Sequence, residues 1–181
     1  MQQPVNRQVI LKSRPSDIPQ AENFAVIESA IPSLNDGQVL VCNVYLSVEP
    51  AMRGWVSAVA NYSEPVAIDG LTVGYVVESR HPDFQNGEVV TGMFGWQDYA
   101  AVEAAAIQRK VPDNGLPIST ALGVLGINGL TAYFGLFDLS QPGPGDTVVV
   151  STAAGAVGSC VGQLAKLHGC RTVGITGGPE K

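Results

Sequence analysis

Residues 147–176 have the sequence TVVVSTAAGAVGSCVGQLAKLHGCRTVGIT, in which two β-branched runs enclose a glycine-rich turn and an apolar pattern. Residues 147–151 predict a strand, because β-branched side chains favour extended backbone. Apolar residues then recur at helical spacing over 156–168, and Gly169 supplies a helix stop. A second strand is predicted over 171–176. This order predicts one βαβ unit with parallel strands.

The turn of this unit resembles a dinucleotide-binding fingerprint. In the pattern G-x-G-x-x-G, Ala153 stands at the first glycine, and Gly155 and Gly158 stand at the second and third. Gly155 would let backbone N–H groups approach a pyrophosphate at the positive end of the helix, and Gly158 would let the helix pack closely on the strand. Tight helix–strand packing without a ligand is the alternative. The βαβ context favours a nucleotide site.

The end of the second predicted strand indicates which nucleotide binds. NAD sites usually place Asp or Glu at this strand end to accept a hydrogen bond from the ribose 2′-hydroxyl. Here the strand runs into Thr176, Gly177 and Gly178, which leave room, and Lys181 follows with a positive charge for a 2′-phosphate. NADP is therefore favoured over NAD. The alternative for Lys181 is an ordinary solvated surface lysine.

Residues 7–111 are β-rich. Short runs of apolar and β-branched residues alternate with turns, and the run 38–46 alternates only loosely, as expected of a strand buried on both faces. The predicted strands are 8–12, 24–29, 38–46, 73–79, 88–94, 96–102 and 107–110. We expect Trp96 and Tyr99 to pack onto the core of this β-rich part.

The pattern becomes helical after residue 111. Helical segments are predicted over 118–122, directly after Pro117, and over 130–139. We therefore place one domain in residues 1–125 and the start of an α/β domain in residues 126–181. Parallel sheets need helices on both faces, so one βαβ unit is only the beginning of such a domain.

Composition excludes several classes of protein. Ten Lys and Arg against sixteen Asp and Glu give a net charge of −6, which disfavours a nucleic-acid partner. Charged residues make up 14% of the chain and hydrophobic residues 45%, which excludes a disordered protein. The three cysteines lack zinc-site spacing, so no disulfide framework or metal site is predicted. We expect a protein of the cytoplasm.

Residues 114–137 carry no charge and are long enough to span a bilayer. Pro117 and five glycines interrupt them, so a buried helical region is the preferred interpretation and no membrane partner is expected. The N-terminal residues show no signal-peptide pattern.

Four blocks together resemble one family. They are YLSVEPAMRG (45–54), GWQDY (95–99), GINGLTAYFGL (126–136) and residues 153–181. The chain resembles the zinc-independent, NADP-dependent branch of the medium-chain dehydrogenase/reductase superfamily, with its prostaglandin, leukotriene B4, alkenal and curcumin-type reductases. The resemblance implies an α+β chain in two parts: a GroES-like β-barrel domain, then the first βαβ of a Rossmann domain. Members are longer, so the chain is expected to be truncated and inactive alone.

The resemblance also implies residue roles in binding NADP. Asn128 and Thr131 would border the nicotinamide, although many members have Met-Pro-Gly where residues 127–129 read Ile-Asn-Gly. The pyrophosphate loop would comprise Gly155, Ala156, Val157, Gly158 and Ser159, and Lys181 would contact the 2′-phosphate.

Three residues are candidates for the substrate pocket. Ala51 stands where many members carry a pocket tyrosine, and the loss of this aromatic wall would enlarge the pocket or change its preferred shape. Arg53 would lie near the cofactor cleft, where it would pair with a phosphate or carboxylate; an ion pair with Glu49 is the alternative. Tyr62 is a pocket candidate whose alternative is a half-exposed loop aromatic.

The expected reaction needs no zinc. Zinc-dependent relatives carry a Cys near residues 47–53 and a Gly-His-Glu element, and both are lacking here; His81 and His168 are expected in ordinary packing or surface roles. We predict an NADPH-dependent reductase of the C=C bond of enals and enones, acting as a homodimer when full length. A quinone oxidoreductase and a non-catalytic nucleotide-binding or structural module are the alternatives.

Overall fold

The computed structural model describes residues 4–56 and 67–178, and the chain separates into two compact units. Unit 1 comprises Met1–Ile118 and unit 2 comprises Ser119–Lys181. The predicted boundary between residues 125 and 126 lies a few residues later. The difference arises because the uncharged segment that follows Pro117 folds with the helices of unit 2.

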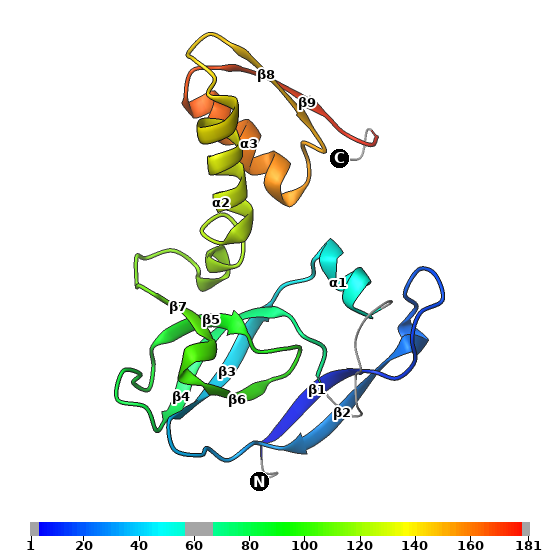
Figure 1. Ribbon diagram of the computed structural model, residues 1–181, viewed down its shortest axis with the longest axis vertical. Helices are drawn as coiled ribbons and strands as arrows, with labels where there is room; N and C mark the ends of the chain where they lie inside the picture. Colours follow the sequence, from blue (N-terminus) through cyan, green and yellow to red (C-terminus); the bar gives the residue numbers. More distant parts are fainter. Residues whose placement is uncertain (1–3, 57–66, 179–181) are drawn as a thin grey trace. The chain divides into compact units, whose positions relative to one another are not determined.

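Unit 1 is built on a five-stranded antiparallel sheet with the strand order β6-β3-β4-β5-β7 (Figure 1). A separate hairpin joins β1 and β2. The bounds of these strands are β1 Val5–Leu11, β2 Phe24–Ala30, β3 Gln38–Leu46, β4 Leu71–Ser79, β5 Val89–Met93, β6 Tyr99–Glu103 and β7 Ile107–Val111. All seven predicted strands are present. The segment predicted over 96–102 begins later, at Tyr99, because Gly95 has a positive φ and Trp96 bonds to Val9 and Ile68 outside the five-stranded sheet.

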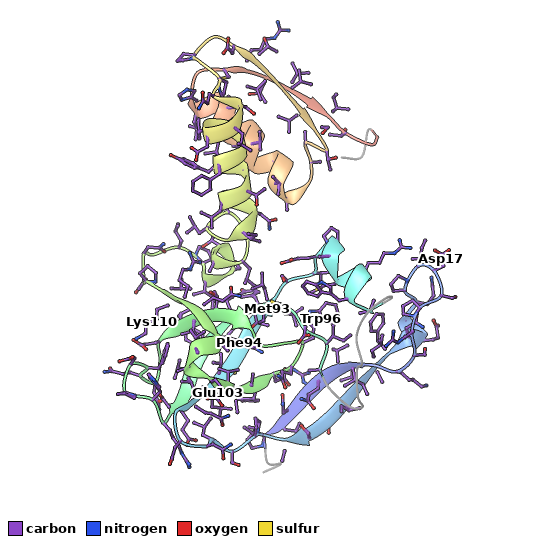
Figure 2. All side chains as sticks on the ribbon, in the orientation of Figure 1. Asp17, Met93, Phe94, Trp96, Glu103 and Lys110 are labelled. Carbon is purple, nitrogen blue, oxygen red and sulfur yellow. The ribbon has the colours of Figure 1, made fainter. Side chains whose placement is uncertain are left out.

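Buried valines of neighbouring strands form the core of unit 1. Val39 and Val41 of β3 pack with Val76 of β4 and Val90 of β5, and Phe94, labelled in Figure 2, completes the cluster with Ala100. Residues two apart on a strand share one face, so the spacing of Val39 and Val41 places both in this core.

Polar side chains attach β1 to Asp98 and to Tyr99, the first residue of β6. Asn6 is 2% exposed; its Nδ2 donates to the Tyr99 carbonyl at 2.9 Å, and its Oδ1 accepts the Tyr99 N–H at 2.9 Å. Arg7 Nε lies 2.7 Å from Asp98 Oδ2, and this guanidinium holds the pKa of the Asp98 carboxyl below its usual value. Trp96 Nε1 donates to the Ser47 carbonyl at 3.1 Å. The bonds of Asn6 and Arg7 connect residues more than ninety positions apart in the sequence, and the bond of Trp96 connects residues 49 positions apart.

Unit 2 contains the predicted strand–helix–strand arrangement. β8 (Thr147–Ser151) pairs in parallel with β9 (Arg171–Ile175), and α3 (Ala156–Leu167) connects them. Before β8 come a 3₁₀ turn, Ile118–Ala121, and α2 (Ile127–Phe134), which continues as a π-helical segment, Gly135–Ser140. The helix predicted over 130–139 therefore begins earlier, because Gly126 takes the extended N-cap conformation.

The helices of unit 2 pack through a small apolar core. Leu136, Ala165 and Cys170 are buried together, and Val148 and Val161 pack against them. The uncharged stretch 114–137 is divided among several short elements. Among the described residues, no helix has the length and apolar character needed to cross a membrane.

Candidate cofactor site

A hollow of about 530 Å³ opens where β8 and β9 end, beside the first turn of α3. Carboxyl ends of parallel strands are the usual ligand positions of α/β sheets. The residues that line the hollow are neutral: Ser151, Thr152, Ala154, Gly155, Ile175, Thr176 and Gly177. A phosphate-bearing ligand therefore meets no negative side chain in this lining.

The glycines bring the helix against the turn. Gly155 is the N-cap of α3, with φ −80° and ψ 171°, and its N–H donates to the Thr152 carbonyl at 2.8 Å. A Cβ on Gly158 would collide with that same carbonyl oxygen and would lie 3.0 Å from Ala153 Cα. The sequence predicts that Gly158 lets the helix pack closely on the strand; the close approach found is to Thr152 and Ala153, in the turn that follows β8.

The first turn of α3 supplies the donors for an anion. The leading N–H groups of any helix lack an acceptor one turn earlier, and the N-terminus carries a partial positive charge. Since the Gly155 N–H is already bonded to Thr152, the donors of this turn are those of Ala156, Val157 and Gly158. Ser159 is one turn further along, where its N–H bonds to Gly155 and its hydroxyl to the Ala156 carbonyl.

The strand end that would meet the adenosine ribose is polar and uncharged. Thr176 Oγ1 donates to the Gly178 carbonyl at 3.3 Å, and Gly177 has open space where a Cβ would lie. A ribose 2′-phosphate fits this environment because, among the described residues, no carboxylate lines it. Lys181, the predicted 2′-phosphate ligand, lies outside the described residues.

Asn128 and Thr131 lie on α2 and do not line this hollow. They are three residues apart, so they share one helix face. Thr131 is exposed and its hydroxyl donates to the Ile127 carbonyl at 2.7 Å, while Asn128 is half-buried. Their predicted contact with the nicotinamide stays a prediction.

Of the three candidate substrate residues, Arg53 lines a second, more open hollow in unit 1. It measures about 430 Å³ and is lined by Pro15, Ser16, Asp17, Pro50, Arg53 and Gly54. Arg53 Nη2 lies 3.4 Å from Oδ1 of Asp17, whose position Figure 2 labels. The alternative given for Arg53, an ion pair with Glu49, is wrong, because the acidic partner is Asp17 in the loop after β1. Ala51 is exposed on α1 (Pro50–Gly54) outside this lining, and Tyr62 lies outside the described residues.

Sequence reasoning missed Thr152 as a site residue. Thr152 lines the hollow, and its backbone has φ 52°, in the left-handed region. Its position between the predicted strand and the first fingerprint residue could have placed it at the site. Its residue type gave no indication of the left-handed conformation. In the described part of the chain, His, Cys, Asp and Glu form no cluster of three that could hold a metal ion.

Comparison with known proteins gives consistent matches. Residues 7–110 match the family described as the N-terminal domain of oxidoreductase. The chain is 48% identical to the NADPH-dependent curcumin reductase of Escherichia coli (strain K12), over 97% of this chain and 52% of that protein. Prostaglandin reductase 1 of Rattus norvegicus is 42% identical, over 94% of this chain and 52% of that protein. The NADP(+)-dependent 2-alkenal reductase of Nicotiana tabacum is 38% identical, over 97% of this chain and 54% of that protein.

A solved structure agrees with these matches. The crystal structure of CurA from Vibrio vulnificus in complex with NADPH superimposes with a TM-score of 0.81 at 48% identity, over 96% of this chain and 52% of that one. The chain thus spans about half the length of the relatives that it matches.

Proposed function

Since this chain belongs to the medium-chain dehydrogenase/reductase superfamily, in the branch of the curcumin, prostaglandin and alkenal reductases, we propose that the whole protein is an NADPH-dependent reductase of α,β-unsaturated aldehydes and ketones. The chain itself comprises the GroES-like domain of that superfamily and a βαβ segment. The observation that carries the proposal is the neutral, glycine-bounded hollow at the ends of β8 and β9.

The residues of unit 2 bind and orient the cofactor. N–H groups of Ala156, Val157 and Gly158 donate to the pyrophosphate, and the helix dipole adds to the attraction. Because Gly155 has no side chain, the pyrophosphate can come close to the backbone, and Lys181 offers its charge to the 2′-phosphate. When bound, NADPH supplies the hydride for reduction of the double bond.

Asn128 and Thr131 are proposed to border the nicotinamide. In unit 1, Arg53, Ala51 and Tyr62 are proposed to border the substrate. The ion pair with Asp17 holds the Arg53 guanidinium beside the 430 Å³ hollow, and the small side chain of Ala51 leaves room for a bulky substrate. We propose that no zinc takes part, because the sequence lacks the Cys and the Gly-His-Glu element of zinc-dependent relatives.

The test is NADPH oxidation by the full-length protein with a panel of short alkenals, aryl enones, saturated aldehydes and quinones. We expect turnover of the enals and enones with recovery of the saturated carbonyl product, and no turnover of the saturated aldehydes. Activity confined to quinones would replace the proposal with quinone reduction. NADPH binding without turnover of any compound would favour a non-catalytic module. Size-exclusion chromatography of the same sample tests the expected homodimer.

A further inference from the structure

Thr152 has a backbone conformation that its residue type disfavours. Its φ is 52°, and a left-handed φ is a genuine outlier for a β-branched residue. Among the described residues, the one other non-glycine residue with a positive φ is Gln141, with φ 47° at the end of the π-helical segment. Strained residues of this kind persist where the surrounding structure holds them, and they cluster at functional sites.

Three contacts hold the strained turn in place. The Thr152 carbonyl accepts the Gly155 N–H at 2.8 Å, so the turn is closed on the N-cap of α3. The absence of a side chain at Gly158 lets the same carbonyl lie against the helix. On the other side, the Ala153 N–H donates to the Ile175 carbonyl of β9 at 3.1 Å. The turn is therefore connected to both β9 and α3, which border the hollow.

From this geometry, we propose that Thr152 is the positioning residue of the cofactor hollow, an inference that rests on the proposed NADPH-binding function. Its left-handed backbone directs its carbonyl to the Gly155 N–H, which leaves the donors of the next residues of α3 for the pyrophosphate. Thr152 and Gly155 both line the hollow, and Thr152 Cγ2 lies 3.1 Å from where a Cβ on Gly155 would be. Because the pyrophosphate is common to both dinucleotides, Thr152 affects NADPH and NADH equally.

Thr152→Gly in the full-length protein tests this role. Glycine accepts a positive φ without strain, so we expect a higher Tm. Glycine also populates other φ values, so the turn is no longer confined to the conformation that fixes the first turn of α3. Kd should therefore rise about tenfold for NADPH and by the same factor for NADH, the size of one weakened charge-assisted contact. The measurements are calorimetric Kd values for both cofactors and thermal melting.

Gln141→Gly is the matched control, because it removes a positive φ from a non-glycine residue in the same unit but outside the hollow. Its Tm should change, while its Kd values for NADPH and for NADH should stay at those of the wild-type protein. Thr152→Asn is the rescue variant, since Asn tolerates the left-handed region and still carries a side chain beside Gly155; its Kd values should stay within about twofold of wild type.

The results separate the two proposals. If the wild-type protein binds NADPH, and Thr152→Gly shifts Tm but changes the Kd of neither cofactor, the positioning role is overturned and the proposed function stands. A change in Kd for one cofactor alone would also overturn the positioning role, because the pyrophosphate is shared. Wild type that binds neither cofactor would overturn the proposed function, and this inference with it.

Discussion

Two glycines of α3, one turn apart, differ sharply in their surroundings. A Cβ on Gly158 would collide with the Thr152 carbonyl, whereas a Cβ on Gly162 would meet Thr172 Cγ2 at 3.6 Å, an ordinary contact. We expect Gly158→Ala to destabilise the full-length protein by about 1–3 kcal/mol, the usual cost of overpacking. It should also weaken NADPH binding about tenfold, because it displaces the donors at the helix start.

Gly162→Ala is the control on the same helix. It should stabilise the protein by up to about 1 kcal/mol, because alanine favours helix more than glycine does. Denaturant unfolding and calorimetric NADPH titration of both variants check this pair. Equal behaviour of the two variants would contradict the close approach at Gly158.

Lys181 is the residue that sequence reasoning assigns to the 2′-phosphate. Lys181→Ala in the full-length protein should lower the preference for NADPH over NADH at least about tenfold, since a hydrogen bond to a charged group contributes about 1.5–3 kcal/mol and NADH lacks the phosphate. Lys166→Ala, which removes an exposed lysine from the last turn of α3, is the control and should leave this ratio unchanged. Equal losses for both cofactors on Lys181→Ala would remove this residue from the site.

At the scale of elements, the attachment of β1 depends on the buried amide of Asn6. Its replacement by alanine leaves the Tyr99 N–H and carbonyl without the partners they have in the structure. Asn6→Ala should therefore cost about 2–4 kcal/mol, because buried unpaired polar groups retain their desolvation penalty. Gln8→Ala removes the 2.7 Å bond from Gln8 Nε2 to Gln97 Oε1 at a half-buried position and should cost about 1 kcal/mol or less.

Urea unfolding of the two variants, followed by tryptophan fluorescence, measures the difference. A loss for Asn6→Ala no larger than that for Gln8→Ala would show that the attachment of β1 does not depend on the Asn6 amide.

At the scale of the whole molecule, unit 2 has an incompletely covered sheet. Val149 of β8 is 60% exposed and Ile175 of β9 is 56% exposed, although parallel sheets are normally covered on both faces. We therefore expect a polypeptide of residues 1–181 to bind NADPH with a Kd above about 100 µM, far more weakly than the full-length protein. Calorimetry on both proteins decides this, with circular dichroism to show that the shorter one is folded. Micromolar affinity for residues 1–181 would show that this chain contains a sufficient cofactor site.

Local patterns were enough to predict much of the fold. The βαβ unit followed from β-branched runs, a glycine-rich turn and helical spacing, and β3 was predicted with its observed bounds because its turn and its β-branched run are both local signals. The family also followed from the sequence, since four short blocks carry its motifs in order. These features depend on residues near one another in the chain, which is the information that periodicity and motifs contain.

The partners of individual side chains needed the folded chain. Arg53 meets Asp17 instead of the nearby Glu49, and Asn6 bonds to Tyr99, because the fold brings together segments that are distant in the sequence. The left-handed backbone of Thr152 is likewise set by its bonds to α3 and the contacts of Gly158, against the preference of its own residue type. Local backbone propensities differ by free energies of only about 1 kcal/mol per residue. Tertiary hydrogen bonds and packing therefore decide the conformation wherever they conflict with local propensity.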